Sequence, residues 1–241
     1  MGSSMSVSPW HICVLIPACN ESELLPRCLR SIIAARSKLP LQVTCDVVVA
    51  VDSSTDGTRE LAENLLYGIG TVVSTEAKSV GQTRALATEI ALTRYEGSMK
   101  RCWLANTDAD CSVPDSWLKD QLALAEQNVE AVAGIVDVDS FHEHQPHVKA
   151  RFYATYLIPE DGSHSHVHGA NLGIRADAYL RAGGWAALTT AEDHDLWNRL
   201  RAAGSTILSI AKLRVWTSGR RVGRAPHGFA DALAAHNEAA A

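Results

Sequence analysis

Two aspartates separated by one alanine, Asp108 and Asp110, follow an apolar run that ends at Ala105. Residues i and i+2 of an extended chain point to the same side, so both carboxylates can face one point at the rim of a sheet. Two close carboxylates repel each other unless a cation lies between them. Mg²⁺ and Mn²⁺ accept one or two protein carboxylates and complete their coordination with water and phosphate oxygens. The pair therefore indicates a metal–diphosphate site, and the competing interpretation is a solvated acidic turn or a cap of the following helix.

Strands and helices alternate through the first part of the chain. Short apolar runs predict buried strands at 11–16, 46–51, 68–74, 102–105 and 129–138. Amphipathic segments predict helices over about 22–35, 58–66 and 114–128, and a further helix that starts at Gly81. This alternation predicts an α/β fold with a right-handed, mostly parallel central sheet.

Ligands of such sheets bind beyond the carboxyl ends of the strands. Four polar segments fall at those ends, at 17–21, 52–58, 74–84 and 108–110. The acidic pair is one of them, so the predicted fold brings it together with three other loops that could contact the same ligand.

The alternation breaks after residue 139. Segment 140–168 is rich in His and Pro, and we expect it to be irregular or helical. A short strand near 171–175 and a small helix to Arg181 follow, and then a helix over 192–203, a strand over 206–210 and an alanine-rich helix over 228–240. The second part of the chain is therefore predicted to be a smaller, mixed region.

Composition limits the class of protein. The chain has 241 residues, of which 46% are apolar and 20% charged, enough for one sizeable core. A formal net charge of -5 argues against a nucleic-acid-binding surface. No apolar run reaches the length of a membrane span, and the N-terminus lacks the features of a signal peptide. The six cysteines have no Cys-x-x-Cys spacing, so we expect a cytoplasmic protein with reduced, mostly buried thiols.

Several other site patterns are incomplete. No G-x-G-x-x-G follows a predicted strand, which argues against NAD, and neither a Walker A loop nor G-x-S-x-G occurs. An EF-hand that began at Asp108 would need glycine and glutamate where Val113 and Lys119 stand. Segment 142–147 has proline in place of the second histidine of H-E-x-x-H. The alternating histidines of 164–168 could bind zinc from one side of a strand, but a polar loop is the favoured interpretation.

Four motifs occur in order along the chain, namely Leu15–Glu21 (LIPACNE), Asp52–Thr58 (DSSTDGT), Asp108–Asp110 and Glu192–Asp193. Together they resemble the family 2 glycosyltransferases of GT-A fold, over nearly the whole chain from Ile12 to about Gly223. The resemblance implies a single GT-A domain, with a nucleotide-binding half over 8–138, an acceptor-binding half over 139–227 and a C-terminal helix and tail over 228–241. It also implies inverting transfer of a sugar from a nucleotide diphosphate to a hydroxyl group.

The resemblance implies a donor site formed by Pro17, Cys19, Glu21, Asp52, Lys78, Arg84 and Asp108. Glu21 and Asp52 can accept hydrogen bonds from a base N–H or from ribose hydroxyls. The alternative for Asp52 is a turn residue that closes on its own backbone. Lys78 and Arg84 would lie near phosphate, and the alternative for Arg84 is an exposed position on its helix.

The same resemblance assigns Asp110 as the direct metal ligand and Asp108 as a contact of ribose or of the metal, with His227 as a third ligand. On the acceptor side it assigns Asp193, together with Glu192, as the catalytic acidic pair, and Asp193 as the general base. Favourable charge at a helix N-terminus is the other account of this pair.

The resemblance further implies acceptor-side and donor-sugar loops, with His168, Gly169, Asn171 and Trp185 as binding residues. Trp185 could stack on a sugar ring, and core packing is the alternative. Three arginines in a glycine-containing loop, Arg220, Arg221 and Arg224, match phosphate geometry and suggest a mobile lid over the diphosphate. The alternative for this loop is an exposed basic segment.

The expected cofactors are Mn²⁺ or Mg²⁺ and a UDP- or GDP-sugar donor, and the expected partner is a small-molecule or glycan acceptor. Q-x-x-R-W and membrane helices of processive members are absent, which favours transfer of a single sugar by a soluble enzyme. Weak contact of the arginine loop and C-terminal helix with an anionic membrane surface stays open.

Two alternatives to a glycosyltransferase are considered. A sugar-phosphate nucleotidyltransferase would need a glycine-rich basic loop after the first strand, where residues 17–21 supply none. A non-catalytic nucleotide-sugar-binding protein would not need both acidic pairs, and both are intact.

Overall fold

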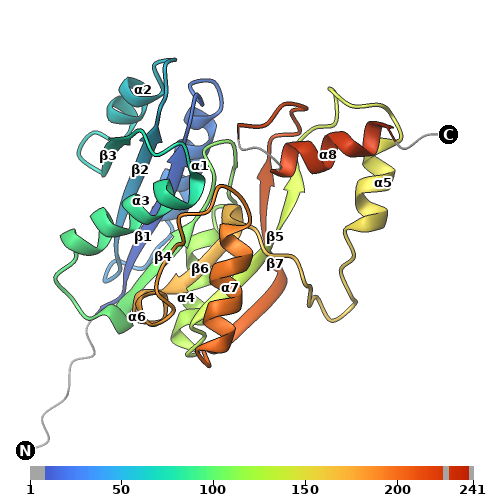
Figure 1. Cartoon of the computed structure of the whole chain (residues 1–241). Helices are drawn as coiled ribbons and strands as arrows, with labels where there is room; N and C mark the ends of the chain where they lie inside the picture. The colour runs from blue at the N-terminus through green and yellow to red at the C-terminus, as the bar shows by residue number, and fades with distance from the viewer. Residues whose placement is uncertain (1–8, 225–227, 239–241) are drawn as a thin grey trace, which may run out of the picture.

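The computed structural model describes residues 9–224 and 228–238. The seven strands of these residues form one sheet in the order β3-β2-β1-β4-β6-β5-β7 (Figure 1). The strands are β1 (His11–Ala18), β2 (Thr44–Asp52), β3 (Gly70–Thr75), β4 (Cys102–Asn106), β5 (Ala131–Val138), β6 (Leu172–Arg175) and β7 (Ile207–Thr217). Among these strands only β6 runs antiparallel to its neighbours. The predicted α/β class with a mostly parallel sheet is confirmed.

Helices cover both faces of the sheet. The helices are α1 (Leu25–Arg36), α2 (Thr58–Leu65), α3 (Val80–Arg94), α4 (Trp117–Glu126), α5 (Val148–Thr155), α6 (Ala176–Arg181), α7 (Glu192–Ala202) and α8 (Phe229–Glu238). Buried residues of α1, α2 and α4 pack on one face, and those of α3, α6 and α7 pack on the other. Because both faces are covered, β1 is apolar and fully buried from Ile12 to Ile16, without alternation.

Strand β7 is longer than the sequence predicts, since it continues from Ile207 to Thr217. Its second part alternates, with Leu213, Val215 and Thr217 buried and the residues between them more exposed. An edge strand needs only one apolar face, so Lys212 and Arg214 interrupt the apolar run without ending the strand. The extension carries the chain to the same edge of the sheet as the ends of β1 and β2.

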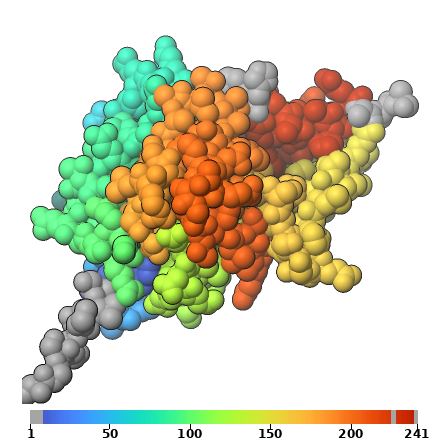
Figure 2. Space-filling view, turned by 60° about the horizontal axis from the view of Figure 1, so that its bottom comes forward, coloured from blue at the N-terminus to red at the C-terminus, as the bar shows by residue number. Residues whose placement is uncertain are grey.

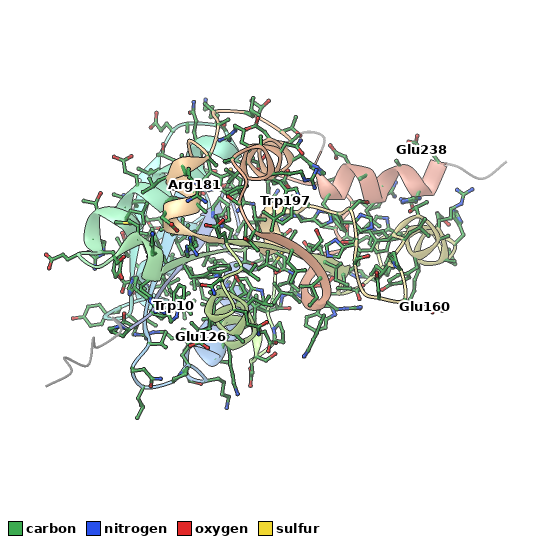
Figure 3. All side chains as sticks on the ribbon, turned by 90° about the horizontal axis from the view of Figure 1, so that it is seen from below. Trp10, Glu126, Glu160, Arg181, Trp197 and Glu238 are labelled. Carbon is green, nitrogen blue, oxygen red and sulfur yellow. The ribbon has the colours of Figure 1, made fainter. Side chains whose placement is uncertain are left out.

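The segment expected to be irregular or helical contains α5, which packs against α8. Val148 and Phe152 of α5 and Leu233 of α8 form a small apolar cluster with Val138. Figure 3 shows Glu160 and Glu238 at this end of the molecule and Trp10 and Glu126 at the other. In the described residues, no helix is long and apolar enough to cross a bilayer. The six cysteines are unpaired, and all except Cys19 are buried.

The parallel register brings the polar segments together at one edge. Ala18 of β1 pairs with Val51 of β2, and Leu15 pairs with Asn106 of β4. The residues just beyond these pairs therefore share the carboxyl edge of the sheet, where the sequence predicts the ligand site.

Asn171 connects four elements inside the core. Its Oδ1 accepts a hydrogen bond from Trp117 Nε1 at 2.9 Å, and its Nδ2 donates to the carbonyls of Ile135 and Leu213, each at 2.9 Å. A Cβ on Gly134 would lie 2.2 Å from this Nδ2, so the glycine makes room for the amide. Asn171 is fully buried and its amide is engaged in the core, which argues against the acceptor-binding role expected for it.

We expect Asn171→Ala to lower the free energy of unfolding by about 3 kcal/mol, because it leaves an indole N–H and two carbonyls without this partner. Urea unfolding followed by circular dichroism measures the change. Asn64→Ala, at an exposed position of α2, is the control and should change the value by less than about 0.5 kcal/mol. Equal, small effects of the two substitutions would show that Asn171 does not hold the core together.

Candidate functional site

A pocket of about 430 Å³ opens at the carboxyl edge of the sheet. Nine of the residues expected to bind donor or metal line it, namely Pro17, Cys19, Glu21, Asp52, Lys78, Asp108, Asp110, Arg220 and Arg224. Ser79, Thr83, Thr189 and Phe229 also line it, and sequence reasoning did not select them. For Ser79 a signal existed, since Ser-x-x-Gln before a helix is a capping pattern, and its side chain accepts from Gln82 N–H at 3.4 Å.

Asp108 and Asp110 follow the end of β4, and their carboxylates lie close to each other. One ligand atom from each, together with Sγ of Cys111, lies within 4.8 Å of the others. Burial raises the pKa of Asp110 to about 6, while Arg220 lowers it and Asp108 raises it further. Burial also raises the pKa of the Cys111 thiol well above its usual range, so the sulfur stays protonated. Two carboxylates beside a neutral thiol suit a hard divalent cation that also binds phosphate oxygens.

Arg220 neutralises the acidic side chains at this point of the pocket. Its Nη2 lies 2.6 Å from Glu21 Oε1 and 2.9 Å from Asp110 Oδ2, and its Nη1 lies 3.0 Å from Glu21 Oε2. The bidentate pair occupies both oxygens of Glu21, so this carboxylate holds Arg220 rather than presenting free acceptors to a base or ribose. The carboxylate of Asp110, which is expected to bind the metal, is therefore paired with the guanidinium of Arg220 in this structure.

The other two arginines of the loop differ from Arg220. Nε of Arg224 donates to the carbonyl of Asn20 at 3.1 Å, and Arg224 lines the pocket. Arg221 is exposed, outside the pocket lining, and its backbone N–H donates to Glu143 at 3.0 Å. Two of the three arginines, Arg220 and Arg224, thus line the pocket, and Arg221 does not.

Asp52 is buried, and its carboxylate accepts four hydrogen bonds from its own chain. The donors are the backbone N–H groups of Lys78 and Ser79, at 3.1 and 3.2 Å, and the hydroxyls of Thr83 and Ser53, both at 2.9 Å. These donors use the acceptor capacity that the resemblance reserves for the nucleoside. Asp52 therefore ties the start of α3 to the end of β2, and since only the Ser53 contact is local, it does not simply close on its own backbone as the alternative expects.

Backbone strain is concentrated around the pocket. Five non-glycine residues of the described chain have left-handed φ angles, and four of them, Asn20, Ser53, Lys78 and Ala191, adjoin the site residues. The left-handed conformation costs a residue with a Cβ about 1–2 kcal/mol. Such residues persist where surrounding contacts hold them, as they do at binding and catalytic sites.

The second acidic pair begins α7, outside the lining of the pocket. Asp193 Oδ2 accepts a hydrogen bond from the backbone N–H of Gly169 at 2.8 Å. Glu192 is buried, and its Oε1 lies 3.3 Å from Nε of Arg84. Burial raises the pKa of Glu192, while Arg84 opposes the shift. Arg84 is only 2% exposed, so the surface alternative for this residue is wrong.

The expected acceptor residues divide into two groups. His168 and Gly169 lie beside Asp193, and His168 Nε2 is 3.0 Å from the hydroxyl of Tyr156. Burial lowers the pKa of His168 to about 4, with Asp193 opposing, so the imidazole is neutral at pH 7. Trp185 is buried in the core, like Asn171, which favours core packing over an open sugar-stacking face.

The alternating histidines of 164–168 do not form a close group of metal-binding atoms in the described residues. Rings of His166 and Tyr156 stack with centroids 3.9 Å apart, and the only close grouping of metal-binding atoms in the described residues is that of Asp108, Asp110 and Cys111. The favoured polar-loop interpretation of 164–168 agrees with this arrangement. His227 lies outside the described residues.

The profile of the family described as "Glycosyl transferase family 2" matches residues 13–181. No curated protein matches the chain. The mannosyltransferase PcManGT from Pyrobaculum calidifontis, in complex with GDP-Man and Mn²⁺, is 21% identical with a TM-score of 0.66, over 91% of this chain and 59% of that chain. TarS 1-349 from S. aureus, in complex with UDP-GlcNAc, is 15% identical with a TM-score of 0.65, over 91% and 61% of the two chains.

At these identities the likeness shows a shared fold, and it confirms the expected GT-A architecture. The chain spans less than two thirds of the length of either protein.

We expect Ala191→Gly to raise the free energy of unfolding by up to about 1 kcal/mol, because glycine adopts a φ of 58° without the Cβ penalty. Ala123→Gly, at an exposed position inside α4, is the control and should lower the value by about 1 kcal/mol. Urea unfolding compares both variants with the parent chain. If Ala191→Gly lowers the free energy of unfolding as much as Ala123→Gly does, the turn before α7 is not strained.

Proposed function

The chain belongs to glycosyl transferase family 2, and from that premise we propose a metal-dependent, inverting transfer of one sugar from a nucleotide-diphosphate sugar to an acceptor hydroxyl. The observation that carries the proposal is the position of Asp108 and Asp110 on the wall of the pocket at the carboxyl edge of the sheet. Ligands of open α/β sheets bind at this edge.

Asp108 and Asp110 would hold the metal, which we propose to be Mn²⁺ or Mg²⁺. The donor set supports a hard cation, because it consists of two carboxylates and no ionised thiol. When bound, the metal would neutralise charge on the leaving diphosphate. The two similar structures contain GDP-Man with Mn²⁺ and UDP-GlcNAc, which supports a UDP- or GDP-sugar as the donor here.

The remaining pocket residues would bind the rest of the donor. Pro17 and Cys19 form the wall on which we place the nucleoside, beside the turn that Asp52 holds in shape. Lys78, Arg220 and Arg224 supply positive charge for the diphosphate. Arg220 would have to leave Asp110 to do so, which agrees with the expected movement of its loop.

Asp193 is the proposed general base. Its Oδ2 is held by the N–H of Gly169, and it lies partly exposed in the first turn of α7. It would accept the proton of the acceptor hydroxyl as that oxygen attacks the anomeric carbon from the face opposite the diphosphate. Attack from that face inverts the configuration, through a transition state of oxocarbenium character. His168 and Gly169 would contact the acceptor, a small molecule or glycan.

We propose the division into halves 8–138 and 139–227 with a tail from 228 on the same grounds, since the donor and metal residues come largely from the first half. We also propose a cytoplasmic location. The six unpaired cysteines support a reducing compartment.

The proposed activity predicts slow release of free nucleotide from a UDP- or GDP-sugar in the presence of Mn²⁺, and loss of that release on chelation with EDTA. Proton NMR of the released sugar, recorded before mutarotation, should show the anomer opposite to that of the donor. If the protein binds the donor but releases no nucleotide over hours, it is a nucleotide-sugar-binding protein and the proposed transferase activity is wrong.

We expect Asp193→Asn to keep donor affinity and to lower the rate of release by about 100- to 10,000-fold, because the amide cannot accept the proton. Calorimetry and the release assay measure the two quantities. Asp195→Asn is the control on the same helix, where Asp195 pairs with Arg199, and it should change the rate less than about twofold. Normal turnover of Asp193→Asn would exclude Asp193 as the base.

The raised pKa of Asp110 predicts a pH-dependent affinity for Mn²⁺. A proton competes with the metal below the pKa of about 6, so the affinity should fall with decreasing pH below 6 and level off above 7. Because one proton is involved, the fall should be about tenfold per pH unit. Calorimetry from pH 5 to pH 8 tests this, with Asp110→Ala expected to lose binding and the exposed Asp115→Ala to retain it. An affinity that does not change over this range would count against Asp110 as a ligand.

A further inference from the structure

Arg84 lies beneath the pocket, between the two acidic pairs. Its Nη2 is 2.5 Å from Asp108 Oδ1, and its Nε is 3.3 Å from Glu192 Oε1. Asp108 belongs to the loop after β4 and Glu192 to the first turn of α7, so one guanidinium joins the metal side of the site to its acceptor side. Figure 2 shows the segment around α7 in the middle of one face, between α3 and the α5–α8 end.

Gly169 provides the space for this guanidinium. A Cβ at position 169 would lie 2.6 Å from Arg84 Nη2 and 2.8 Å from Cζ. Such distances are shorter than van der Waals contact allows, so any side chain at 169 would displace Arg84. The backbone N–H of Gly169 also donates to Asp193, so the residue that gives Arg84 room also holds the proposed base.

The environment keeps the guanidinium charged and out of reach of a ligand. Burial disfavours the charged form, but Asp108, Glu192 and Asp193 outweigh it and raise the pKa of Arg84. On another side the guanidinium lies 5.4 Å from the ring centroid of Trp185. Arg84 is not among the residues that line the pocket, and its side chain is only 2% exposed.

These contacts disagree with the expected role of Arg84 as a phosphate ligand. A diphosphate in the pocket would need an accessible N–H, whereas Nη2 and Nε already contact carboxylates and Nη1 is buried. If lysine replaced Arg84, its ammonium group could not reproduce the planar guanidinium that contacts both carboxylates. Asp108 and Glu192 would then both shift.

We propose that Arg84 is a positioning residue that sets the place of Asp108 relative to Glu192 and Asp193, and that Gly169 acts with it by leaving room for the guanidinium. This inference rests on the proposed function, since it explains how the metal site and the base keep one geometry. A displacement of about 1 Å between reacting groups can lower a rate on the order of 100-fold, which is the scale of effect expected here.

The test uses Arg84→Lys, Gly169→Ala and the double variant, with Arg101→Met as the control. Arg101 also lies over an indole, 5.1 Å from the ring centroid of Trp10, but outside the pocket lining. Three quantities are measured for each full-length variant: the melting temperature without ligand, the affinity for UDP and GDP with Mn²⁺, and the rate of nucleotide release.

We expect each single variant to lower the release rate by about 30- to 100-fold and the nucleotide affinity with Mn²⁺ by a clearly smaller factor, because the donor does not touch Arg84 and only the displaced Asp108 would weaken the metal site. The double variant should resemble the worse single variant in both rate and melting temperature, since without a guanidinium the Cβ at 169 has nothing to displace. Arg101→Met should leave the release rate unchanged.

Two results would overturn the inference. A loss of nucleotide affinity as large as the loss of rate in Arg84→Lys would make Arg84 a donor ligand instead. Additive changes in melting temperature and rate in the double variant would show that Arg84 and Gly169 act separately. The melting temperatures are measured without ligand, so they test the coupling even if the parent chain releases no nucleotide, a result that would count against the proposed function alone.

Discussion

Repulsion among acidic side chains at one edge of the sheet is the constraint on which this structure depends. Glu21, Asp108 and Asp110 line the pocket there, and Glu192 and Asp193 lie close by, around the same guanidinium as Asp108. Glu21 and Glu192 are buried, and the other three are partly buried. Unpaired carboxylates in such a place would take up protons or force the loops apart. Two guanidinium groups prevent this, Arg220 between Glu21 and Asp110, and Arg84 between Asp108 and Glu192. Fewer positive than negative charges remain, which leaves the site able to accept a cation.

Hydrogen bonds and left-handed turns fix the backbone around this edge. Asp52 fixes the start of α3, and left-handed residues turn the chain at the ends of β1 and β2 and before α7. The antiparallel strand β6 lies between β4 and β5, so the turn that precedes it, at 169–171, is held among the ends of parallel strands. That position brings Gly169 against both Arg84 and Asp193. A donor would therefore meet a largely preformed site, in which the arginine loop is the part with most freedom to change its contacts.

Sequence periodicity is enough to predict the elements that carry the site, because the buried parallel strands are short apolar runs and the loops after them are polar. Periodicity also indicates that Arg84 is buried, because it lies three residues before Ala87 and seven before Ala91 on the buried stripe of α3. Its partners could not be predicted in this way, since Asp108 and Glu192 are 24 and 108 residues distant. For the same reason the core position of Asn171 was not foreseen, because a buried amide is identified only by the donors and acceptors that surround it. The end of β7 was missed because an edge strand tolerates charged residues on its open face.

The pair between Arg220 and Glu21 joins residues 199 positions apart. A contact of such long sequence separation forms only after most of the chain has been ordered, whereas the β1–β2 and β2–β3 pairings can form early. During synthesis, Glu21 and Asp110 therefore emerge from the ribosome without their counter-charge, and the pocket acquires its electrostatic balance only when the segment after β7 arrives.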